Sequence, residues 1–310
     1  MLQPIVEICK NFGFDFALVS LLSGKLSVLH DLKHKKILNY LRKNYGDVIF
    51  EYKKKVSNET QQSNIIWTLW WQGDRDEYLP EAVKLCFSMM RKFRGNNQLK
   101  ILTKHNIHEY VELPEHIMEK FSQGKISMAH FSDIIRAYLL SRYGGLWLDA
   151  TVLVTDEIPS EIFKLKYFTV KRNFIPGGNI THNRWMTFLQ GAEKGSKLFN
   201  FIYDFFVAYC KKEDCFIDYL LQDYLLHIAM EEFPECKRDY DAIPMNNLEI
   251  FTLHDFLMNK EWDEKIFNDV KKDTRFFKLK WKTKYKKFIH GKETFYGHFI
   301  GSSTFNAAFF

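Results

Sequence analysis

A single carboxylate in an apolar run is the residue of this sequence that could most directly do chemistry. Asp149 lies in the middle of the apolar and β-branched stretch from Leu146 to Thr155, directly after Gly144-Gly145. The composition predicts one buried strand here, and burying an isolated carboxylate costs many kcal/mol. Asp149 therefore needs an oppositely charged partner or a position where the strand opens onto a cleft. A carboxylate closed off from any cavity, or held only in a salt bridge of its own, would overturn a functional interpretation.

The residues before the double glycine predict an amphipathic helix, which Ser127 can cap and which Gly144 can end in a left-handed conformation. Its apolar positions recur at helical spacing and are Phe131, Ile134, Ile135, Tyr138 and Leu139. A separate face of this helix carries Ser132, Asp133 and Arg136. Taken alone, Asp133 and Arg136 are most simply an i,i+3 ion pair worth about 0.2–0.5 kcal/mol. Beside the lone carboxylate they indicate a polar ligand site.

Strands and helices alternate in the flanking segments that must position these residues. Ile65 to Trp70 has the composition of a buried strand, Glu81 to Phe93 reads as a helix, and Leu99 to Leu102 as a short strand. This alternation predicts an α/β layered fold. A polar run around residues 55–63 precedes the first strand, so we expect an N-terminal helical segment over 1–57 and a second domain over 58–310.

These segments together resemble glycosyltransferase family 32 and the related bacterial capsular polysaccharide synthesis proteins, which are sugar-nucleotide transferases with a DXD motif. The resemblance rests on the pattern S-D-x-x-R followed by Y-G-G-x-W-x-D, which here runs from Ser132 to Asp149. It extends to the strand Ile65–Trp70 and to the closing motif H-x-x-G-S, from His298 to Ser302. It therefore spans residues 60–305.

The resemblance implies a GT-A fold, in which a Rossmann-like sheet between layers of helices binds a nucleotide-sugar donor, by default a UDP-sugar, at the carboxyl ends of its strands. It also implies donor-binding roles for residues of this chain. Trp70 and Trp67 would flank the nucleobase. Asp133, beside Ser132, would accept hydrogen bonds from the ribose hydroxyls. Arg136 would approach the nucleotide or hold Asp133 in place.

The same resemblance implies a divalent-cation site at the donor diphosphate. Asp149 would bind Mn²⁺ or Mg²⁺ directly or through water, His298 would add a ligand, and Ser302 would donate to the diphosphate. The cation would neutralise the charge of the departing nucleoside diphosphate. A full DXD motif has a second carboxylate where this chain has Thr151, a poorer metal ligand. Either His298 and water complete the shell, or metal affinity is weaker, or the dependence on metal is partly lost.

The acceptor side is expected on a helix predicted over Ile217 to Leu226. Asp218, Gln222 and Asp223 lie close together on one side of it and resemble the D-Y-x-x-x-D stretch of the capsule-type enzymes. They are either a solvated helix face or catalytic residues at the hydroxyls of the sugar and the acceptor. The loop at residues 176–179 is either a turn or part of the acceptor mouth. By resemblance, the transfer retains the anomeric configuration, and no residue is a secure nucleophile.

Basic residues are concentrated at the two ends of this chain, whose net charge is +6. Lysines alternate with other residues from Lys278 to Lys286, which predicts an edge strand with its lysines facing water. A sharper alternative is that this face and the basic N-terminal helices rest on anionic lipid, where an oligosaccharide or lipid-linked glycan acceptor would be found. The acidic middle of the chain argues against a nucleic-acid partner.

Composition sets the remaining limits. The chain has 310 residues, of which 46% are apolar and 26% charged, so a globular core is expected. Five cysteines without paired spacing predict reduced thiols, and no uncharged stretch is apolar enough to cross a bilayer. We predict a cytoplasmic hexosyltransferase, with peripheral contact at the inner face of the cell membrane as an option. The alternatives are a non-catalytic module that binds glycan or single-stranded nucleic acid, and a degenerate transferase that binds donor without turnover.

Overall fold

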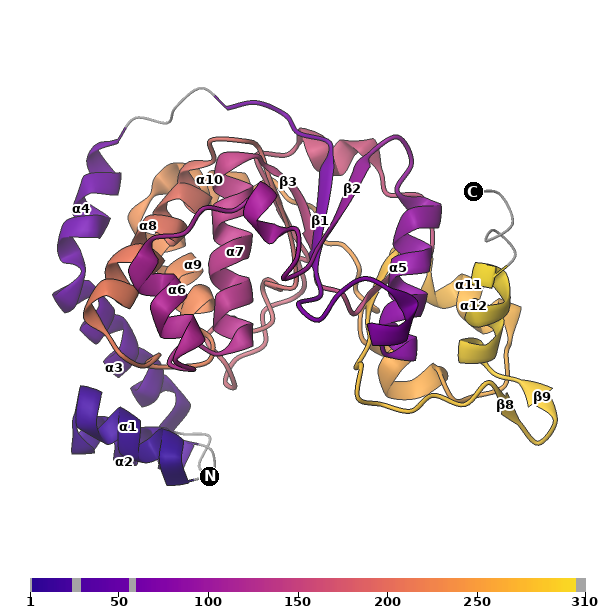
Figure 1. The fold of residues 1–310 in the computed structure, drawn as a ribbon, viewed down its shortest axis with the longest axis horizontal. Coiled ribbons are helices and arrows are strands. Elements are labelled where there is room, and N and C mark those ends of the chain that lie inside the picture. Colours follow the sequence, from indigo (N-terminus) through magenta and orange to yellow (C-terminus); the bar gives the residue numbers. More distant parts are fainter. Residues whose placement is uncertain (1, 24–28, 56–59, 305–310) are drawn as a thin grey trace.

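The computed structural model describes residues 2–23, 29–55 and 60–304, and a five-stranded sheet in the order β2-β1-β3-β6-β5 lies at its centre (Figure 1). The strands are β1 (Ile65–Leu69), β2 (Gln98–Leu102), β3 (Gly145–Leu148), β5 (Tyr167–Thr169) and β6 (Leu189–Ala192). β1 is parallel to β2 and β3, whereas β6 is antiparallel to β3 and β5. The carboxyl ends of β1, β2 and β3 therefore lie at one edge of the sheet. The prediction of an α/β fold is confirmed.

Helices lie on both sides of this sheet (Figure 1). One side holds α6 (Glu115–Ser122), α7 (Met128–Arg142), α8 (Lys197–Lys212), α9 (Leu221–Glu232) and α10 (Pro234–Asp241). The other side holds α5 (Glu81–Phe93), α11 (Glu264–Val270) and α12 (Phe295–Thr304). Because helices cover both sides, β1 is apolar along most of its length, and Ile66 and Trp67 are buried. The helix predicted over Glu81–Phe93 is found with the same bounds.

A double-glycine turn joins α7 to β3. The hydroxyl of Ser127 caps α7 by accepting the backbone N–H of His130 at 3.2 Å, as predicted. At the other end of the helix, Gly144 and Gly145 take positive φ angles of 67° and 97°. A Cβ on Gly145 would lie 2.2 Å from the backbone oxygen of Ile65. Glycine is required here because the turn passes against β1 before β3 pairs beside it.

The prediction of one strand from Leu146 to Thr155 is wrong, because the chain leaves the main sheet at Asp149. The backbone turns after β3, and the N–H of Val152 donates to the backbone oxygen of Asp149 at 2.9 Å. β4 (Val152–Val154) then pairs antiparallel with β7 (Phe276–Lys278) in a second sheet, with Val152 opposite Lys278. Asp149 thus follows directly on β3, beside a strand from the C-terminal part of the chain.

Within residues 2–23 and 29–55, four helices precede the sheet: α1 (Leu2–Phe12), α2 (Phe14–Ser23), α3 (Leu29–Asn44) and α4 (Gly46–Lys54). α3 packs against α9 and α4 against α8, so Ile37, Leu41 and Tyr45 are buried in the same core as the sheet. The division of the chain at residue 57 stays a prediction. None of the helices in the described ranges combines the length and the hydrophobicity that a bilayer span requires.

The helix predicted over Ile217 to Leu226 begins late, at Leu221, and continues beyond the predicted end to Glu232. The side chain of Asp218 accepts the N–H of Leu220 at 2.9 Å and so stabilises a turn in place of a helical one. The other oxygen of Asp218 lies 2.6 Å from Nζ of Lys33 on α3. Asp218 is therefore turned toward the N-terminal helices.

The edge strand predicted from Lys278 to Lys286 is wrong beyond Lys278, where β7 ends. The chain then turns, and the N–H of Thr283 donates to the oxygen of Lys280 at 3.1 Å. A short hairpin follows, made of β8 (Phe288–Ile289) and β9 (Lys292–Glu293). The period-two pattern of lysines is therefore carried by an irregular segment.

Candidate functional site

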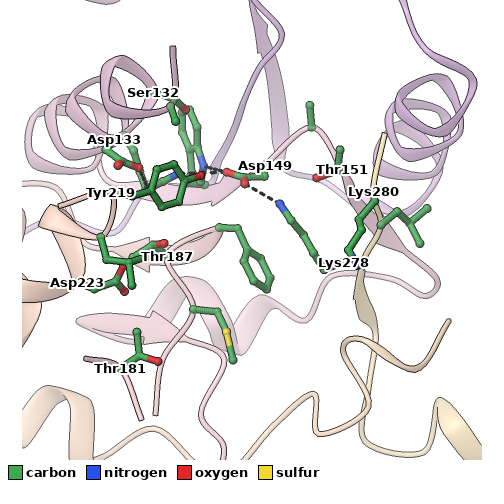
Figure 2. A pocket seen from close by; sticks show the side chains of 18 of the residues that line it. Ser132, Asp133, Asp149, Thr151, Thr181, Thr187, Tyr219, Asp223, Lys278 and Lys280 are labelled. Carbon is green, nitrogen blue, oxygen red and sulfur yellow. Dashed lines mark hydrogen bonds and ion pairs between the residues drawn. The ribbon is translucent and has the colours of Figure 1, made fainter. Parts of the chain in front are cut away.

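A cavity of about 1000 Å³ opens at the carboxyl edge of β1 and β3 (Figure 2). This volume is at the upper end of the range of about 300–1,000 Å³ that is usual for small-molecule sites. Distant segments of the chain line it: residues 69–72 after β1, 128–136 on α7, 149–151 after β3, 175–188 before β6, 219–223 at α9, and 278–283 after β7. The loops that follow parallel strands thus build a pocket where α/β proteins commonly bind ligands.

Asp149 faces this cavity next to Lys278 (Figure 2), and a second cationic side chain, Arg136, shares its carboxylate. Its Oδ2 accepts from Nζ of Lys278 at 2.7 Å. Its Oδ1 accepts from Nη2 of Arg136 at 3.1 Å and from the indole N–H of Trp147 at 2.9 Å. Burial raises the pKa of Asp149, but Lys278 and Arg136 outweigh burial and hold this pKa at about 2. Asp149 therefore has both of the features expected from the sequence, because it has partners and it opens onto a cleft.

Arg136 is the buried centre of the polar wall. Its Nη1 donates to Oδ1 of Asp133 at 2.7 Å and to Oε1 of Gln222 at 2.8 Å. Gln222 in turn donates to Oε1 of Gln190 at 2.7 Å, so the network continues into the core. The i,i+3 pair of Asp133 and Arg136 is thus present, but it belongs to a buried network and not to the surface. Because a guanidinium is planar and rigid, these bonds set the orientation of the carboxylates around it.

Three carboxylates of the cavity differ in pKa. Burial raises the pKa of Asp133 to about 6, although Arg136 opposes this effect. Burial and then the charge of Asp133 raise the pKa of Asp223 to about 7, while the indole N–H of Trp185 donates to Asp223 at 3.0 Å. Asp149 stays ionised over the same pH range. Near neutral pH, the cavity therefore holds one permanently charged carboxylate and two carboxylates that titrate.

Most of the residues that the sequence singled out line this cavity: Trp70, Ser132, Asp133, Arg136, Asp149, Thr151 and Asp223. The loop at residues 177–179 lines it as well. Gln222 lies one layer behind the cavity surface, and Asp218 points to α3. Trp67 is buried within the sheet, where its indole N–H donates to the oxygen of Gly144 at 2.9 Å.

The closing motif lies on α12 and does not reach the cavity. The ring of His298 stacks on Trp262 with centroids 3.7 Å apart, and its Nδ1 lies 3.3 Å from Oε2 of Glu293. The hydroxyl of Ser302 donates to the oxygen of Phe299 at 3.0 Å, within the helix. The structure therefore does not bring His298 or Ser302 to Asp149.

The cavity also contains residues that were not assigned to it from the sequence, namely Trp185, Tyr219, Lys278, Lys280, Trp281 and Lys282. Trp281 packs edge-on against Trp70, with ring centroids 5.7 Å apart. The sequence did contain a signal for the lysines, because their spacing of two predicts that they share one side. That side was interpreted as facing water or lipid, whereas Lys278, Lys280 and Lys282 line the cavity.

The described side chains do not form the ligand set expected for a divalent cation. Within the described ranges, no group of three or more His, Cys, Asp or Glu side chains is placed to hold a metal ion. Both oxygens of Asp149 already accept from cationic groups, and Thr151 offers only a neutral hydroxyl. A metal ion at Asp149 would also meet the positive charge of Lys278 at close range. The donor set as arranged therefore does not fit Mn²⁺ or Mg²⁺.

Fold and site together define an α/β protein with a ligand cavity at the carboxyl edge of its sheet. Residues 23–299 match the family described as "capsular polysaccharide synthesis protein", and the chain belongs to this family. The resemblance to capsular polysaccharide synthesis proteins is thereby confirmed. A comparison with curated proteins gives no match. Twelve chains of solved structures match, among them one titled "PaToxG Glycosyltransferase", with 12% identity, a TM-score of 0.38, and coverage of 80% of this chain and 95% of that chain.

Proposed function

We propose that this protein is a glycosyltransferase with a GT-A fold, which moves a sugar from a nucleotide-sugar to a growing capsular or surface polysaccharide. Family membership supports a role in capsule synthesis. The observation that carries the proposal is the position of Asp149 at the carboxyl end of β3, facing a large cavity and bound by two cationic side chains. Ligands of parallel α/β sheets bind at this edge, and its cationic groups suit a nucleoside diphosphate.

The aromatic end of the cavity suits the nucleobase of the donor, for which uridine is our first choice. Trp70 and Trp281 form this end, and such rings stack well on planar groups. Asp133 and Ser132, on the neighbouring α7, offer hydrogen-bonding groups to the ribose hydroxyls, and Arg136 holds Asp133 in place. The transferred sugar would then lie toward Asp223.

In the proposed reaction, the bond between C1 of the sugar and the β-phosphate oxygen breaks, and its electron pair stays on the diphosphate. The oxygen of the acceptor hydroxyl bonds to C1 from the same face, and its proton passes to the departing diphosphate. This course retains the anomeric configuration. The residues of the chain contribute by holding cationic groups at the developing negative charge.

The acceptor would be an oligosaccharide or a lipid-linked glycan that enters beside Asp223 and the loop at 177–179. This loop is tied to the N-terminal helices, because Nε2 of His34 on α3 lies 3.0 Å from the oxygen of Gly178. Peripheral contact of the N-terminal end with an anionic membrane surface would bring the site close to a lipid-linked acceptor.

The first experiment is a thermal-shift panel of UDP- and GDP-sugars with and without Mn²⁺, because a ligand that binds only the native state raises the melting temperature. Release of nucleoside diphosphate from the stabilising donor is then measured. Asp149→Asn is expected to lower this release by about 10²-fold or more. The matched control is Asp269→Asn, which removes an exposed carboxylate paired with Lys272 and should leave release unchanged.

The opposite result would favour the binding-module alternative. In that case no nucleotide-sugar stabilises the protein, no nucleoside diphosphate is released, and an oligonucleotide or free glycan binds equally well to the protein and to Asp149→Asn.

A further inference from the structure

The strongest unassigned feature of the cavity is its row of lysines. Lys278 ends β7, Lys280 and Lys282 follow it, and all three line the cavity, where Figure 2 labels the first two. Lys280 and Lys282 are exposed, and neither has an ion pair among the described residues. Positive charge without local neutralisation in a ligand cavity indicates an anionic ligand.

The backbone fixes Lys278 beside Asp149. The antiparallel register places Lys278 opposite Val152, and the N–H of Leu279 donates to the oxygen of Thr151 at 2.8 Å. The lysine side chain extends past Phe188, with Nζ 4.6 Å from the ring centroid, and its ammonium group is 2.7 Å from Asp149. About a fifth of the side chain (22%) remains exposed, so the ammonium group is accessible from the cavity.

In a DXD-type site this aspartate would hold a metal ion, whereas here its carboxylate accepts from the ammonium group of Lys278. The second oxygen of Asp149 is taken by Arg136 and Trp147, and Thr151 stands in the position of the second carboxylate. The carboxylate is thus arranged to hold a cationic side chain.

We propose that Lys278 takes the charge-neutralising role of the divalent cation, and that Lys280 and Lys282 extend it, so that this cavity binds a nucleoside diphosphate without metal. This inference rests on the function proposed above and specifies how the same site recognises its donor. An ammonium group binds phosphate as a compact point charge with three donors. One donor of Lys278 goes to Asp149, which acts as a positioning residue, and the others are left for phosphate oxygens.

The role of Lys278 in the reaction follows from the bond that breaks. As C1 separates from the β-phosphate oxygen, the electron pair stays on that oxygen, and the protonated lysine stabilises the added charge by hydrogen bonding. Lys278 keeps its proton throughout, since the acceptor hydroxyl supplies the proton that the departing diphosphate receives.

The experiment measures binding of UDP, and in parallel of GDP, to the full chain by calorimetry in EDTA and in Mn²⁺. For the nucleotide that binds, we expect affinities within about twofold of each other in the two buffers. Lys278→Met, which keeps most of the apolar stem, is expected to weaken binding in EDTA by about ten- to hundredfold, the usual effect of a lost hydrogen bond to a charged group. The matched control is Lys284→Met, on the same segment but outside the cavity lining, which should bind as the unmodified protein does.

A second readout compares the same variant in the two buffers. Lys278→Met frees one oxygen of Asp149, so Mn²⁺ is expected to restore part of the lost affinity in this variant and to have no effect on the unmodified protein. If Lys278→Met lowers the melting temperature strongly, the double variant of Lys280→Met and Lys282→Met, whose side chains are exposed, replaces it and is expected to weaken binding in EDTA by about tenfold.

The outcomes separate this inference from the proposed function. If UDP or GDP binds the unmodified protein only with Mn²⁺, or if the lysine variants bind as tightly as the unmodified protein in EDTA, the lysine proposal is wrong and the proposed function stands. If neither nucleotide binds in either buffer, both are wrong.

Discussion

Three aspartates in one cavity carry different charges at the same pH, and the contacts of each one explain why. Asp149 touches two cationic groups, and its pKa is held at about 2 despite burial. Asp133 forms an ion pair with Arg136 alone in the part of the chain that the structure describes, and burial raises its pKa to about 6. Asp223 accepts from an indole N–H and has no ion pair among the described side chains, so burial and then the charge of Asp133 raise its pKa to about 7. Such separated values let neighbouring carboxyl groups serve different roles in one site.

Asp223→Asn is expected to have a higher free energy of unfolding than the unmodified protein, and this advantage should be larger at pH 8 than at pH 5. The pKa of Asp223 is about 7 in the folded protein and 3.8 in a model peptide, so between these values the native state binds more protons and its stability falls as the pH rises. Asparagine does not ionise and can still accept from Trp185. The gain in unfolding free energy over the unmodified protein should grow from pH 5 to pH 8, by at most about 3 kcal/mol, because the two pH units between pH 5 and the folded pKa are each worth about 1.4 kcal/mol.

Urea unfolding at both pH values measures this difference, with Asp269→Asn as the control because its exposed carboxylate is paired with Lys272. An Asp223→Asn variant whose stability relative to the unmodified protein is the same at both pH values would show that Asp223 ionises normally in the fold.

The residues found from the sequence alone were those whose anomaly is local. Asp149 interrupts an apolar run, and Asp133 and Arg136 share a face of one helix, so a short window is enough to find them. Lys278 lies 129 residues from Asp149, and only the pairing of β4 with β7 brings the two together. Contacts of this kind depend on register between distant strands, which no local periodicity encodes.

The turn between α7 and β3 determines where Asp149 lies, and it depends on glycine. Gly145→Ala is expected to cost at least about 3 kcal/mol, because it combines a left-handed conformation, worth about 1–2 kcal/mol, with a Cβ only 2.2 Å from the backbone oxygen of Ile65. Gly124→Ala separates the two effects, since Gly124 has a φ of +74° and no atom within 4 Å of the added Cβ.

Chemical unfolding of both variants tests this prediction. The Gly124 variant should lose about 1–2 kcal/mol. Equal losses for the two variants would contradict the close approach of the turn to β1.

Elements with one clear periodicity were predicted well, and elements ended by a polar contact were not. The helix Glu81–Phe93 and the strand at Ile65 have the expected positions, because their apolar patterns run uninterrupted. The strand from Leu146 divides at Asp149, where the chain changes sheets, and α9 starts late because Asp218 closes a turn. In both cases a side-chain or strand-pairing contact overrides the local propensity.

The two basic ends of the chain lie far apart along the molecule, and their joint contact with lipid stays a prediction. Figure 1 shows the helices α1 and α2 at one end of the longest axis and the hairpin of β8 and β9 at the other. Part of the lysine segment lines the cavity. The N-terminal end is distinct in another way, because the family match begins at residue 23 and leaves most of α1 and α2 outside it. Any membrane contact is therefore best sought on these two helices.

The exposed apolar side of α2 predicts contact with an anionic membrane. Phe14, Leu18 and Leu21 recur at i, i+4 and i+7 and are 69%, 42% and 45% exposed, with the exposed Lys10 on the adjoining α1. Burying such a side chain is worth about 1.5–3 kcal/mol, and a lysine near anionic lipid adds about 1 kcal/mol. The affinity for phosphatidylglycerol vesicles, measured by co-sedimentation, should therefore fall at least about tenfold when all three apolar residues become serine. The affinity of the unmodified protein should also fall as the salt concentration rises. The control replaces three exposed apolar residues elsewhere, Phe50, Met118 and Phe256, with serine. Equal vesicle binding by both triple variants would place the contact elsewhere on the molecule, and no binding by the unmodified protein would remove the membrane from the proposal.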